Sequence, residues 1–437
     1  MGRTLTLLDG GQATDAVDAV VYWSSSDVPD GAASLPSLVE NEFRELRADF
    51  LDWSAGLADV RVGEHTLASH LCGSGLNGTS WWWTTLISER SPMRSPQIYS
   101  VLKLRVLERL YTQGGYSCLC YIGSDKKLDR ILRRWMSSMR HGYSMQWLGQ
   151  SRPRLNLQAI FACLPQLVRG ILYFGYFLTS RVRHVFPLGA ERVKPLADAD
   201  LAIVSYFPGI DLKAAEQGVF HSHYWGPLHE LIRELGLRVN WVWMYSRSSQ
   251  FTYQESVALR ARCNLAQEEK RERYLVIEDF VTFKVLARAI RNYLWLYRRA
   301  LMLQHISEAF CFDGSRLVFY EFLVEDLKSS MFGKDAMGMC LREALFHETI
   351  SNLPDTTRTL LYLWENMGWE QALLAAWKAR GQGRVIGVLH APSVAAYMNF
   401  RSFAGSAAEA GNGHDGKLVP DYIVVPGEYT QTTLTEG

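Results

Sequence analysis

A side chain that removes a proton from a hydroxyl group must be a base within hydrogen-bond reach, and carboxylates and histidines fill this role most often. Glu365 and Glu370 lie at a turn between a predicted strand, Leu360–Trp364, and a predicted helix, Trp369–Arg380. His223 lies in a polar and aromatic stretch just before another predicted helix. We expect the catalytic base to be Glu365, Glu370 or His223, in that order.

Further polar and aromatic residues gather at similar turns. The segment Gly218–His229 precedes a predicted helix, and His390-Ala-Pro-Ser393 follows the predicted strand Arg384–Leu389. Ligands of open α/β sheets bind at the carboxyl ends of strands, so these turns are expected to form the walls of one cleft. The residues expected to line this cleft or to bind an acceptor in it are Trp82, Glu89, Arg90, Ser91, His221, Tyr224, Trp225, Asn366 and Trp369.

Three adjacent tryptophans, Trp81–Trp83, begin another unusual segment. Neither a helix nor a strand points three consecutive side chains into one core, so at least one tryptophan is expected at a cleft or an interface. Glu89, Arg90 and Ser91 then supply polar groups shortly before Ile98, where a helix is predicted to begin. The N-terminus of a helix is a favourable place for an anion.

Three familiar motifs occur in contexts that argue against their usual functions. Gly73–Gly78 matches the glycine pattern of dinucleotide-binding folds, but a predicted helix precedes it instead of a strand. Asp198-Ala-Asp200 has the form that holds a metal-bound nucleotide in some transferases, but it comes before a strand and not after one. His221 and His223 have no third metal ligand at a suitable spacing. We therefore expect neither a metal nor a bound cofactor.

The elements that must position these residues alternate between strands and helices in the first 150 residues. Apolar residues at helical spacing predict helices, and β-rich apolar runs predict strands. The predicted order is strand Val17–Trp23, helix Ser37–Leu57, helix Ile98–Tyr111, strand Tyr116–Ile122, helix Asp125–Arg140 and strand Tyr143–Leu148. This alternation is typical of an α/β fold with a mostly parallel sheet.

The alternation resumes later in the chain. The predicted elements are strand Asp200–Phe207, helix Trp225–Leu235, strand Arg238–Tyr245, long helices near 253–271, 282–306, 317–330 and 337–351, strand Leu360–Trp364, helix Trp369–Arg380, strand Arg384–Leu389 and strand Tyr422–Val425. We divide the chain into a Rossmann-like part at 1–150, an apolar and basic helical insertion at 151–197, a helix-rich remainder of the first domain at 198–355, and the beginning of a second domain at 356–437.

Composition and charge place the chain among globular proteins. Hydrophobic residues make up 48% and charged residues 21%, which is ordinary for a protein with buried cores. The formal net charge of +1 gives no indication of nucleic-acid binding. The seven cysteines lack paired spacing and the N-terminus lacks the apolar region of a signal peptide, so a cytoplasmic location is expected.

One segment carries a strong local charge. Residues 125–194 contain thirteen Lys or Arg and three acidic residues, a net charge of +10. Within it, 155–178 is apolar but interrupted by Pro165, Gln166 and Arg169, so a membrane-spanning helix is not expected. Two interpretations stay open: peripheral docking on the anionic inner membrane, or solvated helix faces around an internal hairpin.

Four blocks together resemble a family of bacterial surface-carbohydrate biosynthesis proteins, glycosyltransferases of O-antigen and capsule loci. The blocks are WWWTTLISERSPMRSP, FHSHYWGPLHELIRELG, YLWENMGWEQALLAAW and VIGVLHAPSV with PDYIVVPGEYT. The resemblance extends from about Val20 to the end of the chain.

The resemblance implies a GT-B-like fold, with a Rossmann-like N-terminal domain and the start of a second Rossmann-like domain. Such a domain needs five or six strands and only three are predicted after Thr359, so it is expected to be truncated at Gly437. The last block is similar to enzymes that transfer Kdo- or sialic-acid-like sugars from CMP donors. The similarity implies that His390 contacts the donor phosphate, with Ser393 and Gly427 also in the donor-binding part.

The expected function is transfer of a sugar from a nucleotide-sugar donor to a lipid-linked surface polysaccharide at the inner membrane. One alternative is a polymer transferase of the same fold that moves glycerophosphate or ribitol phosphate. The identity of the donor would distinguish this alternative from a sugar transferase. A second alternative is a non-catalytic assembly protein that binds glycan or a partner through its tryptophan-rich surface.

Overall fold

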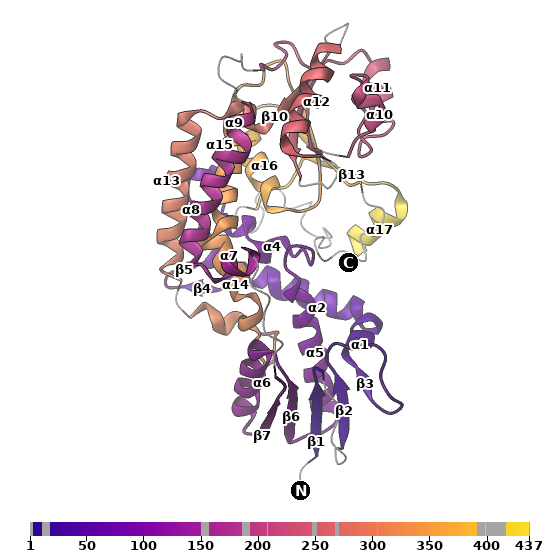
Figure 1. The fold of residues 1–437 in the computed structure, drawn as a ribbon, viewed down its shortest axis with the longest axis vertical. Coiled ribbons are helices and arrows are strands. Elements are labelled where there is room, and N and C mark those ends of the chain that lie inside the picture. Colours follow the sequence, from indigo (N-terminus) through magenta and orange to yellow (C-terminus); the bar gives the residue numbers. More distant parts are fainter. Residues whose placement is uncertain are drawn as a thin grey trace.

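The computed structural model describes residues 3–10, 18–149, 157–185, 193–207, 209–246, 251–266, 271–303, 305–390, 398 and 417–436. These residues form a mixed α/β structure with two separate parallel sheets (Figure 1). The first sheet lies near the N-terminus at the bottom of Figure 1 and the second lies at the top. A layer of long helices runs along one side of the molecule between them.

The first sheet has five strands in the order β3-β2-β1-β6-β7, all parallel. They are β1 (Thr4–Leu8), β2 (Ala19–Tyr22), β3 (Ala33–Ser34), β6 (Cys118–Gly123) and β7 (Gly142–Trp147). Strand β1 was not predicted from the sequence, although it is the central strand and pairs with both β2 and β6. Its leucines Leu5, Leu7 and Leu8 are buried, as expected for a strand covered on both faces.

The helices and short elements around the first sheet follow the predicted order. They are α1 (Leu35–Asn41), α2 (Phe43–Gly56), α3 (Leu67–His70), α4 (Leu86–Glu89), α5 (Gln97–Gln113) and α6 (Lys126–Met139), with a small hairpin of β4 (Arg61–Val62) and β5 (His65–Thr66). The predicted helix Ser37–Leu57 is interrupted at Glu42, whose backbone leaves the helical region. Helix α6 starts where the Asp125 carboxylate accepts the Lys127 and Leu128 backbone N–H groups.

The second sheet has six parallel strands in the order β10-β9-β8-β11-β12-β13. They are β8 (Leu201–Phe207), β9 (Val239–Tyr245), β10 (Glu272–Val276), β11 (Thr359–Leu363), β12 (Arg384–Val388) and β13 (Tyr422–Val424). Numbered along the chain, this is the order 3-2-1-4-5-6 of doubly wound nucleotide-binding folds. The prediction that the last three strands are parallel neighbours is confirmed.

The predicted domain boundary at residue 356 is wrong, because it divides this sheet. Strand β8 pairs with β11, so residues 198–355 contribute half of the second sheet and do not belong with the first. The expectation of a second domain with only three strands is wrong for the same reason. Strand β10, which was not predicted, follows helix α12 and pairs with β9.

A group of helices joins the two sheets. The remaining helices are α7 (Leu157–Cys163), α8 (Gln166–Phe177), α9 (Arg183–Val185), α10 (Leu212–Glu216), α11 (Leu228–Glu234), α12 (Tyr253–Ala266), α13 (Phe283–Ala300), α14 (Tyr320–Phe332), α15 (Lys334–Ser351), α16 (Gly368–Arg380) and α17 (Glu428–Glu436). Helix α15 packs against α8, α13, α14 and α16, and α14 also packs against α5 and α6 of the first sheet. In the described part of the chain, no helix is both long and apolar enough to cross a membrane.

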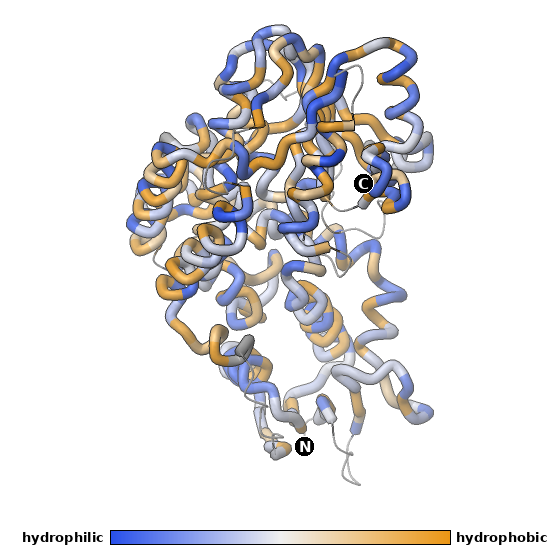
Figure 2. Tube along the Cα trace, turned by 45° about the horizontal axis from the view of Figure 1, so that its top comes forward, coloured by the Kyte–Doolittle hydropathy of each residue, from blue (hydrophilic) through white to orange (hydrophobic). Residues whose placement is uncertain are grey.

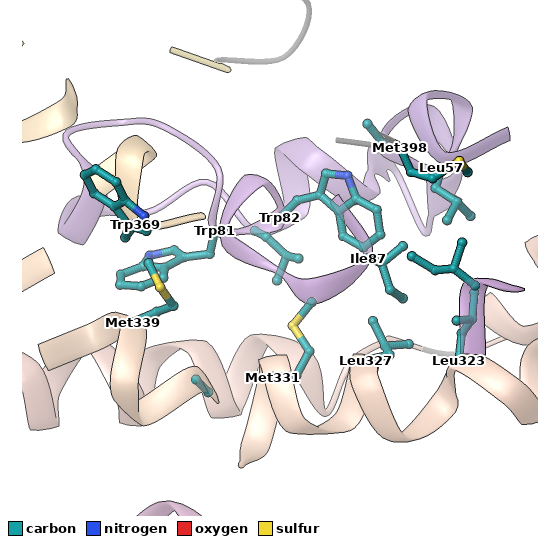
Figure 3. Close-up of a cluster of buried hydrophobic side chains, with 14 of the residues drawn as sticks. Leu57, Trp81, Trp82, Ile87, Leu323, Leu327, Met331, Met339, Trp369 and Met398 are labelled. Atoms are coloured by element: carbon teal, nitrogen blue, oxygen red, sulfur yellow. The ribbon is translucent and has the colours of Figure 1, made fainter. Parts of the chain in front are cut away.

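The three adjacent tryptophans belong mainly to the core. Figure 3 shows Trp81 beside Met339 and Trp369, and both Trp81 and Trp82 are fully buried. The expectation that Trp82 lines a cleft is therefore wrong. Trp83 is the tryptophan that leaves the core: it is half-buried, and the Lys417 ammonium group lies 5.4 Å from its ring centre.

The packing of α16 against the tryptophan segment allows a test at Gly368. A Cβ atom on Gly368 would lie 2.7 Å from the Thr84 carbonyl oxygen and 2.9 Å from Glu89 Oε1. We expect Gly368→Ala to lower the free energy of unfolding by roughly 1–3 kcal/mol, the usual cost of overpacking a core. Urea denaturation followed by circular dichroism measures this. Gly56→Ala is the control, because nothing lies within 4 Å of its Cβ position; equal stability of the two variants would contradict the proposed packing.

Candidate active site

A cavity of about 690 Å³ lies at the carboxyl ends of the second sheet. Tyr206 comes from the end of β8 and Tyr245 from the end of β9, while Glu278, Glu365 and His390 follow β10, β11 and β12. The strand order reverses between β8 and β11, and in a doubly wound sheet this reversal leaves a crevice in which ligands bind. The cavity therefore occupies the position where this fold class binds its ligands.

The opposite wall comes from other parts of the chain. The segment Ser91–Arg94, which precedes helix α5 of the first sheet, forms one side. Helix α8 contributes Tyr173 and Tyr176, and helix α15 contributes Arg342. The cavity is thus enclosed by the second sheet, the helical layer and a loop of the N-terminal half.

Glu365 is a carboxylate that faces this cavity. Its Oε2 accepts a hydrogen bond from the Tyr206 hydroxyl at 2.9 Å, and the Trp369 indole N–H donates to the same hydroxyl at 2.7 Å. Its Oε1 lies 3.6 Å from His390 Nε2, and the His390 ring packs edge-on against Tyr224 at 5.1 Å. Burial raises the pKa of Glu365, while Tyr206 and His390 act in the opposite direction. A raised pKa makes a carboxylate a stronger base.

Glu370 has a structural role, so its expected role as a base is wrong. Its side chain is 2% exposed and does not reach the cavity wall. Its Oε1 accepts hydrogen bonds from the backbone N–H groups of Glu365 and Met367, both at 2.8 Å. Glu370 therefore caps the N-terminus of α16 and fixes the turn that carries Glu365. Desolvation raises the pKa of Glu370 to about 8.

Arg94, Arg181 and Arg342 bring positive charge to the cavity. Arg94 Nη1 donates to Glu89 at 2.6 Å, and Arg181 Nη1 lies 3.3 Å from Glu278. Arg342 forms no ion pair with any carboxylate in the described part of the chain, and its Nη1 donates to the sulfur of Met339 at 3.6 Å. Its charge is therefore available to an anionic ligand.

Arg181, which lines the cavity, contacts one carboxylate and two aromatic rings. It lies in a π-helical turn, Leu178–Val182. Such turns are rare in proteins, and those that occur are often at functional sites. Its guanidinium lies 4.5 Å from the ring centre of Tyr245 and 4.7 Å from that of Tyr253. Burial raises the pKa of its partner Glu278, and Arg181 opposes that shift.

Several of the predicted cleft residues meet at this cavity. Ser91, Tyr224 and Trp369 line it together with Glu365 and His390. Glu89 and Arg90 are buried behind the wall and do not line it. Glu89 nevertheless positions the wall, because it holds Arg94 and also accepts the Gly368 N–H at 2.8 Å.

Other predicted residues lie elsewhere. His223, the third expected base, is exposed and does not line the cavity. The His221 ring stacks on His229 at 5.0 Å. Trp225 is buried and donates to the Ser205 hydroxyl at 2.9 Å. The expectation that these three residues face the cleft is wrong. Within the described part of the loop after β8, Tyr224 is the residue that lines the cavity.

Asn366, predicted as a cleft or acceptor residue, does not line the cavity; its Oδ1 accepts a hydrogen bond from Lys417 at 3.0 Å. The residues predicted to bind the donor are placed as follows. Gly427 lies between β13 and α17 and is not part of the cavity wall. Ser393 lies outside the described residues. Of the residues expected to bind the donor, His390 is the one that the structure brings to the cavity.

Several polar residues of the cavity were not predicted from the sequence. They include Arg94, Tyr206, Arg181, Glu278 and Arg342. Tyr206 could have been found, because it lies at the end of a predicted strand. Glu278 required β10, which was not predicted, and Arg181 and Arg342 lie on helices whose orientation no local pattern reveals.

Neither a metal site nor a match to another protein identifies this cavity. Among the described residues, no three His, Cys, Asp or Glu side chains converge so as to hold a metal ion. Comparison of the chain with protein-family models, curated proteins and solved structures finds no match. What the protein does must be inferred from the chemistry of the cavity and from the resemblance of its sequence blocks.

The buried carboxyl of Glu370 predicts a pH dependence of stability. Its pKa is about 8 in the folded protein against 4.5 for an ordinary glutamate, so the folded state retains a proton that the unfolded chain releases. This contribution is complete below pH 4.5 and is lost as the pH rises through about 8. As the pH rises between these limits, we expect the free energy of unfolding of the wild-type protein to fall by on the order of 3–5 kcal/mol relative to that of Glu370→Gln.

Urea denaturation of both proteins across this pH range measures the difference. Glu230→Gln, which changes an exposed carboxyl, is the control and should follow the wild-type protein. Parallel pH profiles for the wild-type protein and Glu370→Gln would contradict the inferred protonation.

Proposed function

We propose that this protein is a glycosyltransferase of GT-B type that takes its sugar from a nucleotide-sugar donor and transfers it to a lipid-linked surface glycan. The observation that carries the proposal is the cavity at the strand-order reversal of the second sheet, where Glu365 and His390 lie beside arginine side chains. Two parallel sheets with a cavity beside one of them are compatible with that fold type. The block resemblance supports the same function.

The chemistry requires a base and a stabilised leaving group. Glu365 would accept the proton of the acceptor hydroxyl, whose oxygen then forms a bond to the anomeric carbon of the donor sugar. The bond from that carbon to the donor phosphate breaks, and the nucleotide leaves with the bonding electrons. Arg342, Arg94 and His390 would stabilise the negative charge that develops on the phosphate.

The surroundings of Glu365 suit this role. One of its oxygens is fixed by Tyr206 at 2.9 Å. The other is 3.6 Å from His390 Nε2, longer than an ideal hydrogen bond, so an acceptor hydroxyl placed there could contact both groups. Glu370 holds the backbone of the same residue, which limits movement of the base.

A substitution at Glu365 tests the base. We expect Glu365→Gln to lower kcat by at least about 100-fold with little change in the KM for the donor, because general base catalysis usually contributes that much. In the wild-type protein, kcat should fall with decreasing pH through a pKa above the ordinary value of a glutamate, since the base must be ionised. Glu230→Gln is the matched exposed control. Activity retained in Glu365→Gln would exclude this residue as the base.

A substitution at Arg342 tests the phosphate site. We expect Arg342→Gln to raise the KM for the donor roughly 10- to 150-fold, since loss of a charge-assisted hydrogen bond costs roughly 1.5–3 kcal/mol. Nucleotide release from a panel of nucleotide-sugars, CDP-glycerol and CDP-ribitol measures it and also identifies the donor. Release from the polyol donors alone would replace the sugar-transfer proposal with the polymer-transferase alternative. No release from any donor would favour a non-catalytic protein.

A further inference from the structure

Two helices present an apolar face that no other described part of the chain covers. Eleven of the 22 large apolar side chains exposed in the described residues lie on 157–185 and 283–303, far more than an even distribution would place there. They are Ile160, Leu167, Val168, Ile171, Leu172, Tyr176, Phe283, Ile290, Leu294, Leu301 and Met302. A concentration of this kind marks an interaction surface, whereas single exposed apolar residues are normal.

Three of these exposed residues, Phe283, Ile290 and Leu294, line a groove between α8 and α13. Both helices pack on α15, and between them lies an apolar groove of about 650 Å³. Figure 1 shows α13, α8 and α15 next to one another at the left of the molecule, and Figure 2 shows many hydrophobic residues along that side. The apolar lining of the groove includes Phe174, Leu178, Leu286, Ile290, Leu294 and Trp295. Phe283 at its end is 87% exposed.

The two segments that form this face carry basic residues and no acidic residue. Residues 157–185 and 283–303 contain no Asp or Glu. Arg291 and Arg298 line the groove, and neither forms an ion pair with a carboxylate in the described part of the chain. An apolar face with a basic rim and no acidic residue complements an anionic lipid surface, where apolar side chains enter the acyl boundary and arginines meet phosphates.

We propose that the face formed by α8 and α13 docks this protein on an anionic phospholipid bilayer. Ile171, Leu294 and Phe283 enter the boundary between headgroups and acyl chains. Arg291 and Arg298 bind the lipid phosphates, with their aliphatic stems along the groove.

Helix α6, the most basic part of the segment 125–194, is excluded from this face. Its apolar side is buried against the first sheet, and Arg130 and Arg133 pair with Glu321 and Asp129. The sequence predicted docking through the whole basic segment 125–194. The proposed docking face contains only the C-terminal half of that segment, together with α13.

The docking face lies next to the cavity. Tyr173, Tyr176 and Phe177 of α8 line the cavity, while Phe174 and Leu178 line the groove. One helix, roughly 10 Å in diameter, therefore separates the bilayer from the cavity. This last step rests on the proposed function: a glycan carried on a membrane lipid would need to travel only that distance to reach Glu365.

Vesicle sedimentation tests the docking face and requires no donor, so its outcome is independent of the transferase assay. Phosphatidylcholine vesicles with and without phosphatidylglycerol are mixed with the full chain at increasing salt. We expect binding that needs phosphatidylglycerol and weakens with salt. The double variant Ile171→Glu with Leu294→Glu should lower the partition coefficient at least about tenfold. Leu265→Glu is the matched control, because Leu265 is 86% exposed on α12, away from the groove, and should leave binding unchanged.

A second pair of variants separates the two basic regions. Arg291→Gln with Arg298→Gln should lower the partition coefficient about fivefold for each arginine, whereas Arg130→Gln with Arg133→Gln on α6 should leave it unchanged. Equal losses in both pairs would overturn the assignment to α8 and α13. The wild-type protein could instead fail to bind vesicles and form dimers that the double variant Ile171→Glu with Leu294→Glu dissociates. That result would overturn the proposal and show that a second copy covers the face.

Hydrogen exchange of the wild-type protein gives a result that does not depend on how the variants fold. Adding phosphatidylglycerol vesicles should slow exchange in 166–182 and 283–302. Slower exchange in 126–139 alone would place the contact on α6 and overturn the proposal.

Discussion

The carboxylate of Glu89 is buried at a junction of three parts of the fold, and the shape of the cavity depends on its partners. It accepts the N–H of Gly368 at the start of α16, and it pairs with Arg94, which also reaches Asp335 on α15 at 3.0 Å. An unpaired charge in such a place would be costly, so all partners must be in position. Burial raises the pKa of Glu89, and Arg94 and the Gly368 N–H favour its charged form.

This junction explains how distant segments meet around one cavity. The loop that carries Arg94 precedes α5 of the first sheet, whereas α16 follows β11 of the second. A second buried carboxylate, that of Glu370, then holds the turn between β11 and α16 by accepting two backbone N–H groups. Two buried carboxylates thus position the loop, the helix and Glu365 relative to one another, while a third carboxylate, that of Glu365, faces the cavity.

Helix α8 links the cavity to the outer surface. Its residues at one side line the cavity, and those at the other line the apolar groove toward α13. It continues into the π-helical turn that places Arg181 between Tyr245 and Tyr253. Helix α8 is therefore shared by the cavity wall and the apolar groove.

The sequence by itself determined the elements whose cause is local. Apolar periodicity predicted most strands and helices, and the alternation of strands with helices predicted parallel sheets. Residues at strand ends and helix starts meet at one edge of such a sheet. This rule identified five residues of the cavity: Glu365, His390, Ser91, Tyr224 and Trp369. Only the tertiary structure decided which strands share a sheet, because pairing of β8 with β11 joins residues more than 150 positions apart. It also decided that Glu370 caps a helix while Glu365 faces the cavity. The two carboxylates are five residues apart and chemically identical, and only the surrounding packing determines which one is buried under backbone N–H groups.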